Sequence, residues 1–280
     1  MDELAAMQVL LDVELILLIG LALGVLISAL WRRLRGALPT AGDYDHYDLL
    51  LMLFPALLFL LNPIGQLLIA QSSDTEVAAE STSGGLQGIL FNLAYFTFVG
   101  VMTFGILEWI RGKRVVELFG LRRLSLPVIV VTSIIAGVVS VLICVGLVGG
   151  FSNSLVEEVF DRLQAQEPVR NLQKADSHLY LGLSILNACV AAAVVEELLF
   201  RGYMYGAIKN ATNSIFAIFV VGGLFAVVHG NLPAMLPLWV FSILLCLAYE
   251  WSRCLWVPIG MHVFFNATNI VLMMSEHSGD

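Results

Sequence analysis

Eight apolar stretches dominate this sequence, each near the roughly 20 residues that a helix needs to cross the hydrocarbon core of a bilayer. They cover residues 8–31, 48–70, 86–109, 127–149, 179–207, 214–231, 234–251 and 256–274. The composition agrees, because 59% of the residues are hydrophobic and only 13% are charged, whereas about 25% are charged in a soluble domain. We therefore expect an all-α, polytopic membrane helix bundle of about eight transmembrane helices.

The distribution of Lys and Arg among the connections predicts the orientation of this bundle. On one side of the predicted membrane, the connections carry 11 of these residues: Arg32, Arg33, Arg35, Arg111, Lys113, Arg114, Arg122, Arg123, Arg201, Lys209 and Arg253. The connections on the other side carry three: Arg162, Arg170 and Lys174. We expect an integral multi-pass protein of the plasma (inner) membrane with both termini outside.

Charge and cysteine usage exclude several classes of function. The net charge of −8 argues against a nucleic-acid partner. The four cysteines form no CxxC pair, so a zinc ribbon or a disulfide framework is not expected. The chain begins Met1-Asp2-Glu3, which is acidic where a cleavable signal peptide would be basic.

Three ionisable residues inside the fifth apolar stretch are the strongest pointer to a function. Glu196, Glu197 and Arg201 lie within 179–207, and ionisable groups at membrane depth mark functional sites by default. Glu197 and Arg201 are four residues apart and share a helix face, so we expect a supporting ion pair. Glu196 points about 100° away and is free for another task. The alternative without a catalytic role is an interhelical salt-bridge cluster.

The same EExxxR string occurs a second time, at residues 157–162 in the connection 150–178. Apolar residues at helical spacing over 155–163 predict an amphipathic helix along the outer interface there. Because this second copy has polar surroundings, we interpret it as a solvated helix face. The surroundings distinguish the two copies, since the string is the same.

Two later stretches each place polar side chains on one helix face. Phe225 and His229 are four residues apart in the sixth, and so are His262 and Asn266 in the last. At 1.5 Å per residue, Glu196, His229 and Asn266 lie roughly 15–20 Å from the inner ends of their helices, and His262 lies one turn shallower. Taken singly, each is a structural hydrogen-bonding residue; together they can converge inside the membrane.

Two chemistries fit such a convergence. In the first, Glu196 is a general base that takes a proton from water with the help of His229, and His262 and Asn266 donate hydrogen bonds to the oxyanion of a tetrahedral intermediate. In the second, Glu196, His229 and His262 bind a divalent metal such as zinc, which activates the water. The chain lacks the HExxH signature of zinc proteases, which favours the version that requires no cofactor.

The ordered set EExxxR, FxxxH and HxxxN resembles the type II CAAX prenyl endopeptidases and their prokaryotic relatives, the Abi or CPBP intramembrane proteases. The matching residues are Glu196, Glu197, Arg201, Phe225, His229, His262 and Asn266. The resemblance implies a helix bundle with a catalytic cavity inside the membrane and cleavage of membrane-associated proteins or peptides, some of them prenylated. It also implies the metal-free roles given above, although members have been called metalloproteases.

We therefore predict a membrane endopeptidase whose core spans 127–280, with the motifs in 179–274 and accessory transmembrane helices in 1–126. Glu196, His229, His262 and Asn266 are the expected catalytic residues. A catalytically silent immunity or scaffold protein on the same fold is the main alternative. A proton-coupled transporter is disfavoured, because no inverted repeat is visible in the sequence.

Overall fold

The computed structural model describes residues 44–59, 86–150, 178–229 and 231–277. Within these ranges the secondary structure is helical, without strands. The elements are α2 (His46–Leu51), α5 (Leu86–Gly105), η1 (Ile106–Ile110), α6 (Val115–Leu118), α7 (Leu126–Val141), η2 (Leu142–Gly149), α10 (His178–Ile185), η3 (Leu186–Ala191), α11 (Ala192–Glu197), η4 (Leu198–Tyr205), α12 (Gly206–Ala211), α13 (Ser214–Val227), α14 (Leu232–Ser252) and α15 (Trp256–His277). The all-α prediction is confirmed.

Four of these helices are long and apolar enough to cross a membrane. They cover Gly88–Ile110, Leu126–Gly149, Leu179–Ala211 and Ala234–Ser252. Three shorter apolar helices cover Tyr47–Phe59, Ser214–Val227 and Trp256–Leu272. Seven of the eight predicted stretches thus coincide with a helix, wholly or in part. The first stretch, the rest of the second and the predicted amphipathic helix at 155–163 lie outside the described residues.

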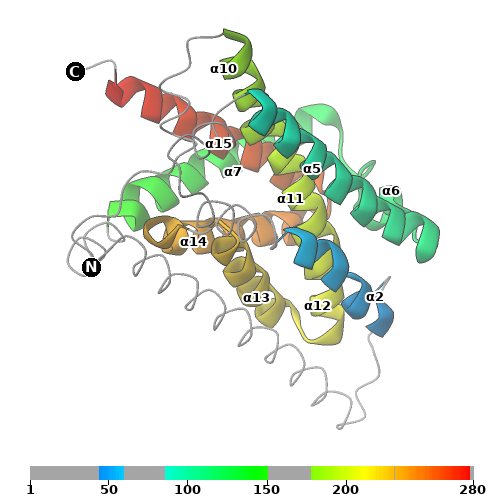
Figure 1. Cartoon of the computed structure of the whole chain (residues 1–280). Coiled ribbons are helices and arrows are strands. Elements are labelled where there is room, and N and C mark those ends of the chain that lie inside the picture. Colours follow the sequence, from blue (N-terminus) through cyan, green and yellow to red (C-terminus); the bar gives the residue numbers. More distant parts are fainter. Residues whose placement is uncertain (1–43, 60–85, 151–177, 230, 278–280) are drawn as a thin grey trace, which may run out of the picture.

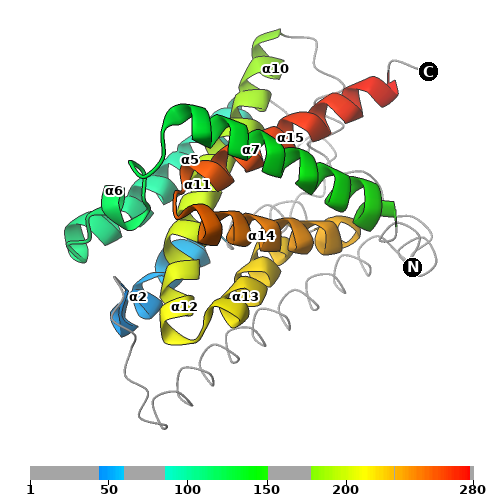
Figure 2. The same ribbon diagram turned by 180° about the vertical axis from the view of Figure 1, so that it is seen from behind.

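The basic connections, predicted to share one side of the membrane, lie against one another. α2, α6 and α12 gather toward the right in Figure 1 and toward the left in Figure 2, away from α10 and the end of α15. The contacts that join the connections are Asp45 with Arg111, Tyr44 with Asn210, Lys209 with Glu250, and Phe119 with Leu255. This arrangement agrees with the alternation of Lys and Arg; which face is inside stays a prediction.

Small residues bring α7 and α15 into close contact. A Cβ added at Gly137 would lie 2.6 Å from Phe264, and one added at Gly260 would lie 2.5 Å from the Ser133 hydroxyl. That hydroxyl donates to the carbonyl of Val257 at 3.1 Å. Small side chains and interhelical hydrogen bonds are the usual means of helix association in a bilayer. They fix α15, which carries His262, against α7.

Two glycines shape the connection around α6. Gly112 and Gly120 have φ values of +60° and +62°, in the left-handed region that L side chains rarely adopt. A Cβ on Gly120 would lie 1.9 Å from the carbonyl oxygen of Arg253, whereas one on Gly112 would meet nothing within 4 Å. Gly120 therefore also allows the close approach of the α14–α15 turn.

We predict that Gly120→Ala destabilises the protein much more than Gly112→Ala. Both variants bear the left-handed strain, roughly 1–2 kcal/mol, but only the Gly120 variant also collides with backbone, which we expect to bring its total above about 3 kcal/mol. Thermal unfolding midpoints of the two purified variants in detergent provide the comparison. Equal midpoints would show that the close approach of Gly120 to Arg253 contributes nothing to the stability difference.

Candidate active site in the membrane interior

The helix Leu179–Ala211 is the structural centre of the candidate site. Half of the residues in its most apolar 18-residue segment are buried, against 22–33% in the corresponding segments of the other three candidate spans. It winds as a π-helix on both sides of the short α segment α11, in η3 and η4. π-helical turns occur frequently at functional sites. Glu196 and Glu197 are the last two residues of α11.

Glu197 and Arg201 form the ion pair that their spacing predicts. Arg201 Nη1 donates to Glu197 Oε1 at 2.9 Å, and both side chains are fully buried. Arg201 Nη2 donates to the Ser242 hydroxyl of α14 at 2.5 Å. The guanidinium carbon also lies 4.6 Å from the centre of the Phe225 ring, a cation–π contact. The buried charge is thus held by three elements.

His262 joins this pair from α15. Its Nδ1 lies 2.8 Å from Glu197 Oε1. A carboxylate that already accepts from arginine can only accept, so His262 Nδ1 is the donor in this bond. The second ring nitrogen, Nε2, then faces Glu196 Oε2 at 3.9 Å. Glu197 therefore orients the imidazole as well as balancing Arg201.

His229 approaches Glu196 from the end of α13. Its Nδ1 lies 2.7 Å from the carbonyl oxygen of Phe225, and because a carbonyl only accepts, Nδ1 carries the proton. The bond satisfies one of the carbonyls left over at the helix C-terminus. His229 Nε2 then lies 4.0 Å from Glu196 Oε2. Glu196 Oε2 is buried and has no hydrogen-bond partner among the described residues.

Phe225 packs between the charged groups. Its ring centre lies 4.6 Å from that of His229 and 5.8 Å from that of His262. Phe200 contacts the same ring edge-on at 5.3 Å. Phe225 is fully buried, so it fills the space beside the Arg201 guanidinium and the two imidazoles. A supporting role for this residue stays a prediction.

Asn266 lies on α15 beyond His262. Its Nδ2 donates to the carbonyl oxygen of Ala188 at 2.8 Å, and Ala188 precedes Glu196 by about two helical turns. The structure therefore brings Glu196, His229 and His262 together, and it ties Asn266 to the same central helix by a different contact. An amide nitrogen has two N–H donors, so one remains beyond the bond to Ala188.

The predicted metal ligands do not form a metal site as they stand. Tetrahedral zinc with ligands at 2.0–2.2 Å would place neighbouring donor atoms about 3.4 Å apart, whereas Glu196 Oε2 lies 3.9 and 4.0 Å from the two imidazole nitrogens. Among the described residues, no group of three His, Cys, Asp or Glu side chains has a geometry that could hold a metal ion.

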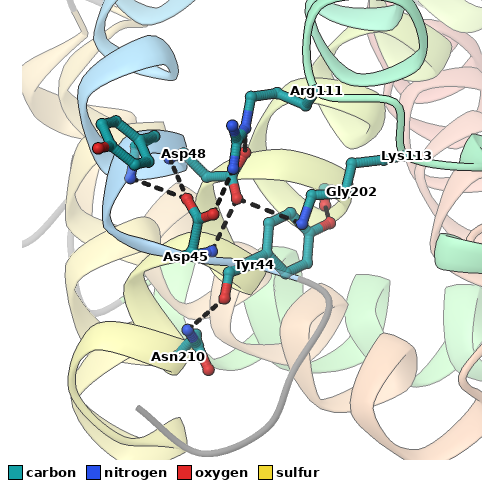
Figure 3. Close-up of polar contacts among 8 residues, drawn as sticks. Tyr44, Asp45, Asp48, Arg111, Lys113, Gly202 and Asn210 are labelled. Carbon is teal, nitrogen blue, oxygen red and sulfur yellow. Dashed lines mark hydrogen bonds and ion pairs between the residues drawn. The ribbon is translucent and has the colours of Figure 1, made fainter. Parts of the chain in front are cut away.

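A second charged cluster lies beside the central helix at Gly202 (Figure 3). Asp48 is fully buried and accepts from Arg111 Nε at 3.0 Å, with Lys113 Nζ at 3.6 Å. Arg111 also pairs with Asp45, the N-cap of α2. Burial alone would raise the pKa of Asp45, but the N–H of Tyr47 and the Arg111 guanidinium lower the pKa below its ordinary value.

This cluster is connected to the central helix through Tyr44. The Tyr44 hydroxyl donates to the carbonyl of Gly202, the residue after Arg201, and Asn210 Nδ2 donates to the carbonyl of Tyr44. Lys113 lies 5.9 Å from the Tyr44 ring centre. Residues assigned to accessory helices from the sequence thus contact the motif helix directly, one residue from the buried arginine.

Sequence analysis missed three contributors to the site. Ser242 accepts from Arg201, Phe241 packs against His262 with ring centres 5.3 Å apart, and Asp48 connects α2 to the end of η1. Ser242 and Asp48 are polar residues inside predicted apolar stretches, which is the signal that could have found them. Phe241 has no such signal, because an aromatic residue in an apolar helix is ordinary.

We predict that Glu197→Gln lowers the stability of the folded protein by about 3–5 kcal/mol, because it leaves the Arg201 charge buried without its partner. The matched control is Glu117→Gln, which removes the carboxylate of the Arg114–Glu117 pair; those side chains are 78% and 61% exposed. An exposed pair contributes less than about 1 kcal/mol. Wild-type thermal stability in Glu197→Gln would contradict the supporting role.

Comparison with known proteins agrees with this geometry. Residues 178–268 match the family "Type II CAAX prenyl endopeptidase Rce1-like". A relative from Bacillus subtilis (strain 168), named "Putative membrane peptidase YdiL", is 30% identical over 94 residues. That alignment covers 34% of this chain and 38% of the relative's length. No solved structure matches the chain significantly. The segment 178–268, which contains all seven motif residues, is therefore similar to the Rce1-like type II CAAX prenyl endopeptidases.

Proposed function

We propose that this protein is an intramembrane endopeptidase that hydrolyses a peptide bond of a membrane-associated substrate, a class that includes prenylated proteins. One observation carries the proposal: Glu196 Oε2 is buried, has no hydrogen-bond partner among the described residues, and faces the Nε2 atoms of His229 and His262. The match to the Rce1-like family and the relative named as a membrane peptidase support it.

The spacing around Glu196 suits a nucleophilic water. A water molecule can lie about 2.8 Å from each of two polar atoms that are 4.0 Å apart. Glu196 Oε2 and neutral His229 Nε2 are both acceptors, so each takes one hydrogen of the same water. The water's lone pair is then directed away from both groups, toward the substrate.

His262 supplies positive charge for the oxyanion. Because its Nδ1–H donates to Glu197, its Nε2 carries a proton only when the ring is an imidazolium. In that state Nε2–H can donate to the oxygen that becomes negative, while Nδ1–H stays bonded to Glu197. We propose the free N–H of Asn266 as the second donor, which requires substrate to seat the carbonyl between α15 and the central helix.

In the proposed reaction, Glu196 accepts a proton in the first step and returns it in the second. The water oxygen forms a bond to the carbonyl carbon as Glu196 takes the proton, and the carbonyl electrons move onto the oxygen. When the tetrahedral intermediate collapses, the C–N bond breaks and the leaving amine takes that proton from Glu196. The carboxylate returns to its starting state, and the products are a new carboxyl terminus and a free amine.

We predict that Glu196→Gln abolishes cleavage while the protein still folds. Glutamine keeps the size of the side chain but cannot accept the proton, and a general base contributes about 10²–10⁴-fold to the rate. The assay is cleavage of a panel of fluorogenic lipidated peptides by purified protein. Glu157→Gln, in the second EExxxR copy, is the matched control and should cleave like wild type.

The outcomes separate the proposal from its alternatives. Full activity in Glu196→Gln would remove this residue from the mechanism. Loss of activity in Glu157→Gln would contradict the interpretation of the second copy as a solvated face. If neither wild type nor variant cleaves any peptide of the panel, a catalytically silent immunity or scaffold protein becomes the better account of the fold.

Metal dependence is tested separately. We expect cleavage to persist after dialysis against a strong chelator, and elemental analysis of active protein to show far less than one metal ion per chain, because the donor atoms are spaced too widely for tetrahedral coordination. Loss of activity on chelation, with recovery on adding zinc, would overturn the metal-free mechanism and assign Glu196, His229 and His262 as ligands.

A further inference from the structure

A cavity of about 730 Å³ opens beside α6, at the end of the molecule where the basic connections meet. Its charged lining consists of four arginines and two glutamates: Arg114, Arg122, Arg123, Arg253, Glu108 and Glu117. The lining therefore has an excess of two positive charges. None of Glu196, His229 and His262 lines it, so this cavity is distinct from the candidate active site.

The local pairing shows which charges are in excess. Arg114 pairs with Glu117 at 3.0 Å, and Arg253 pairs with Glu250 at 3.1 Å. The remaining carboxylate, Glu108, accepts the backbone N–H of Val115 at 2.8 Å and caps α6. The side chains of Arg122 and Arg123 have no ion-pair or hydrogen-bond partner within the ranges that the structure describes, and both residues are exposed. These two guanidinium groups are available to a ligand.

The position of the cavity identifies the chemistry of that ligand. The candidate spans end at Ile110 and Ser252 and begin at Leu126, so the cavity lies at the ends of three helices, level with the membrane surface. Large apolar side chains within three residues of a lining residue in sequence are highly exposed: Trp109 76%, Leu126 71% and Trp251 75%. Exposed tryptophans at helix ends mark the headgroup level of a bilayer.

We propose that this cavity binds the phosphate of an anionic glycerophospholipid. Arg122 and Arg123 contact the phosphate, which arginine recognises through paired N–H donors, and the acyl chains lie along the apolar side chains at the helix ends. Basic pockets between transmembrane helices bind anionic lipid headgroups in this way. The alternative is that these arginines only set the orientation of the protein in the membrane. Orientation depends on the number of positive charges in the connections, and it requires neither a cavity nor two adjacent unpaired arginines.

The bound lipid would contact structure that supports the active site. Phe119, buried between the lining residues Leu118 and Gly120, packs against Gly202; a Cβ on Gly202 would lie 2.8 Å from its ring. The carbonyl of Phe119 accepts the N–H of Leu255, at the start of the last helix, at 3.0 Å. The cavity wall therefore joins the helices that carry Arg201 and His262. The proposal concerns lipid binding and stands without proteolysis.

The test is native mass spectrometry of the full chain in a nonionic detergent, titrated with phosphatidylglycerol or phosphatidylcholine. We expect wild type to bind one phosphatidylglycerol at least about 30-fold more tightly than phosphatidylcholine, whose choline ammonium balances its phosphate. Each arginine near a headgroup of net negative charge contributes roughly fivefold. Arg122→Gln with Arg123→Gln should lose this preference. Arg122→Lys with Arg123→Lys keeps the charge and should retain most of it.

Several results would overturn the proposal. These are equal binding of the two lipids by wild type, a preference that survives in the double glutamine variant, or a preference lost as fully in the double lysine variant. Displacement of the lipid by millimolar inorganic phosphate would reassign the cavity to the free ion. Thermal unfolding of each variant confirms folding, and the single variants Arg122→Gln and Arg123→Gln replace the double variant if it does not fold.

Discussion

The buried ion pair between Glu197 and Arg201 is the interaction on which the candidate site depends. Two opposite charges at zero exposure are tolerated only when each has further partners, and here the partners include His262, a proposed catalytic residue. Glu197 also accepts from His262, and Arg201 also donates to Ser242 and packs on Phe225. Satisfying one buried pair therefore fixes the central helix, α13, α14 and α15 relative to one another.

The same ion pair explains why we propose different roles for the two adjacent glutamates. Glu197 accepts from both Arg201 and His262 through Oε1, although its Oε2 is also buried without a hydrogen-bond partner among the described residues. Glu196, one residue earlier, has a buried oxygen without a hydrogen-bond partner in the part of the chain that the structure describes. A group that exchanges a proton must not be held ionised by a permanent cation. The pairing of Glu197 thus leaves Glu196 as the group able to act as a base.

Much of this arrangement could be predicted from the sequence, because the depth of a residue in a helix and the face on which it lies both follow from its position along the chain. The apolar stretches locate the helices, and four-residue spacing places Glu197 beside Arg201 and Phe225 beside His229. The contacts between helices could not be predicted, since they depend on rotation and register. Nothing in the sequence shows that His262 bonds to Glu197, that Asn266 reaches Ala188, or that Tyr44 bonds to Gly202 next to the arginine.

Register in such a bundle has to come from polar and small residues. Apolar side chains pack as well against lipid as against each other, so they do not select one rotation of a helix. In this protein, Asp48 and Arg111 fix two helix ends at the surface, Ser133 and Gly260 fix α7 against α15, and the Glu197 cluster fixes the interior. The polar contacts that set helix register in the interior include the proposed catalytic groups. The same contacts therefore position the helices and form the site. A substitution that shifts register should therefore impair catalysis even when no catalytic residue is changed.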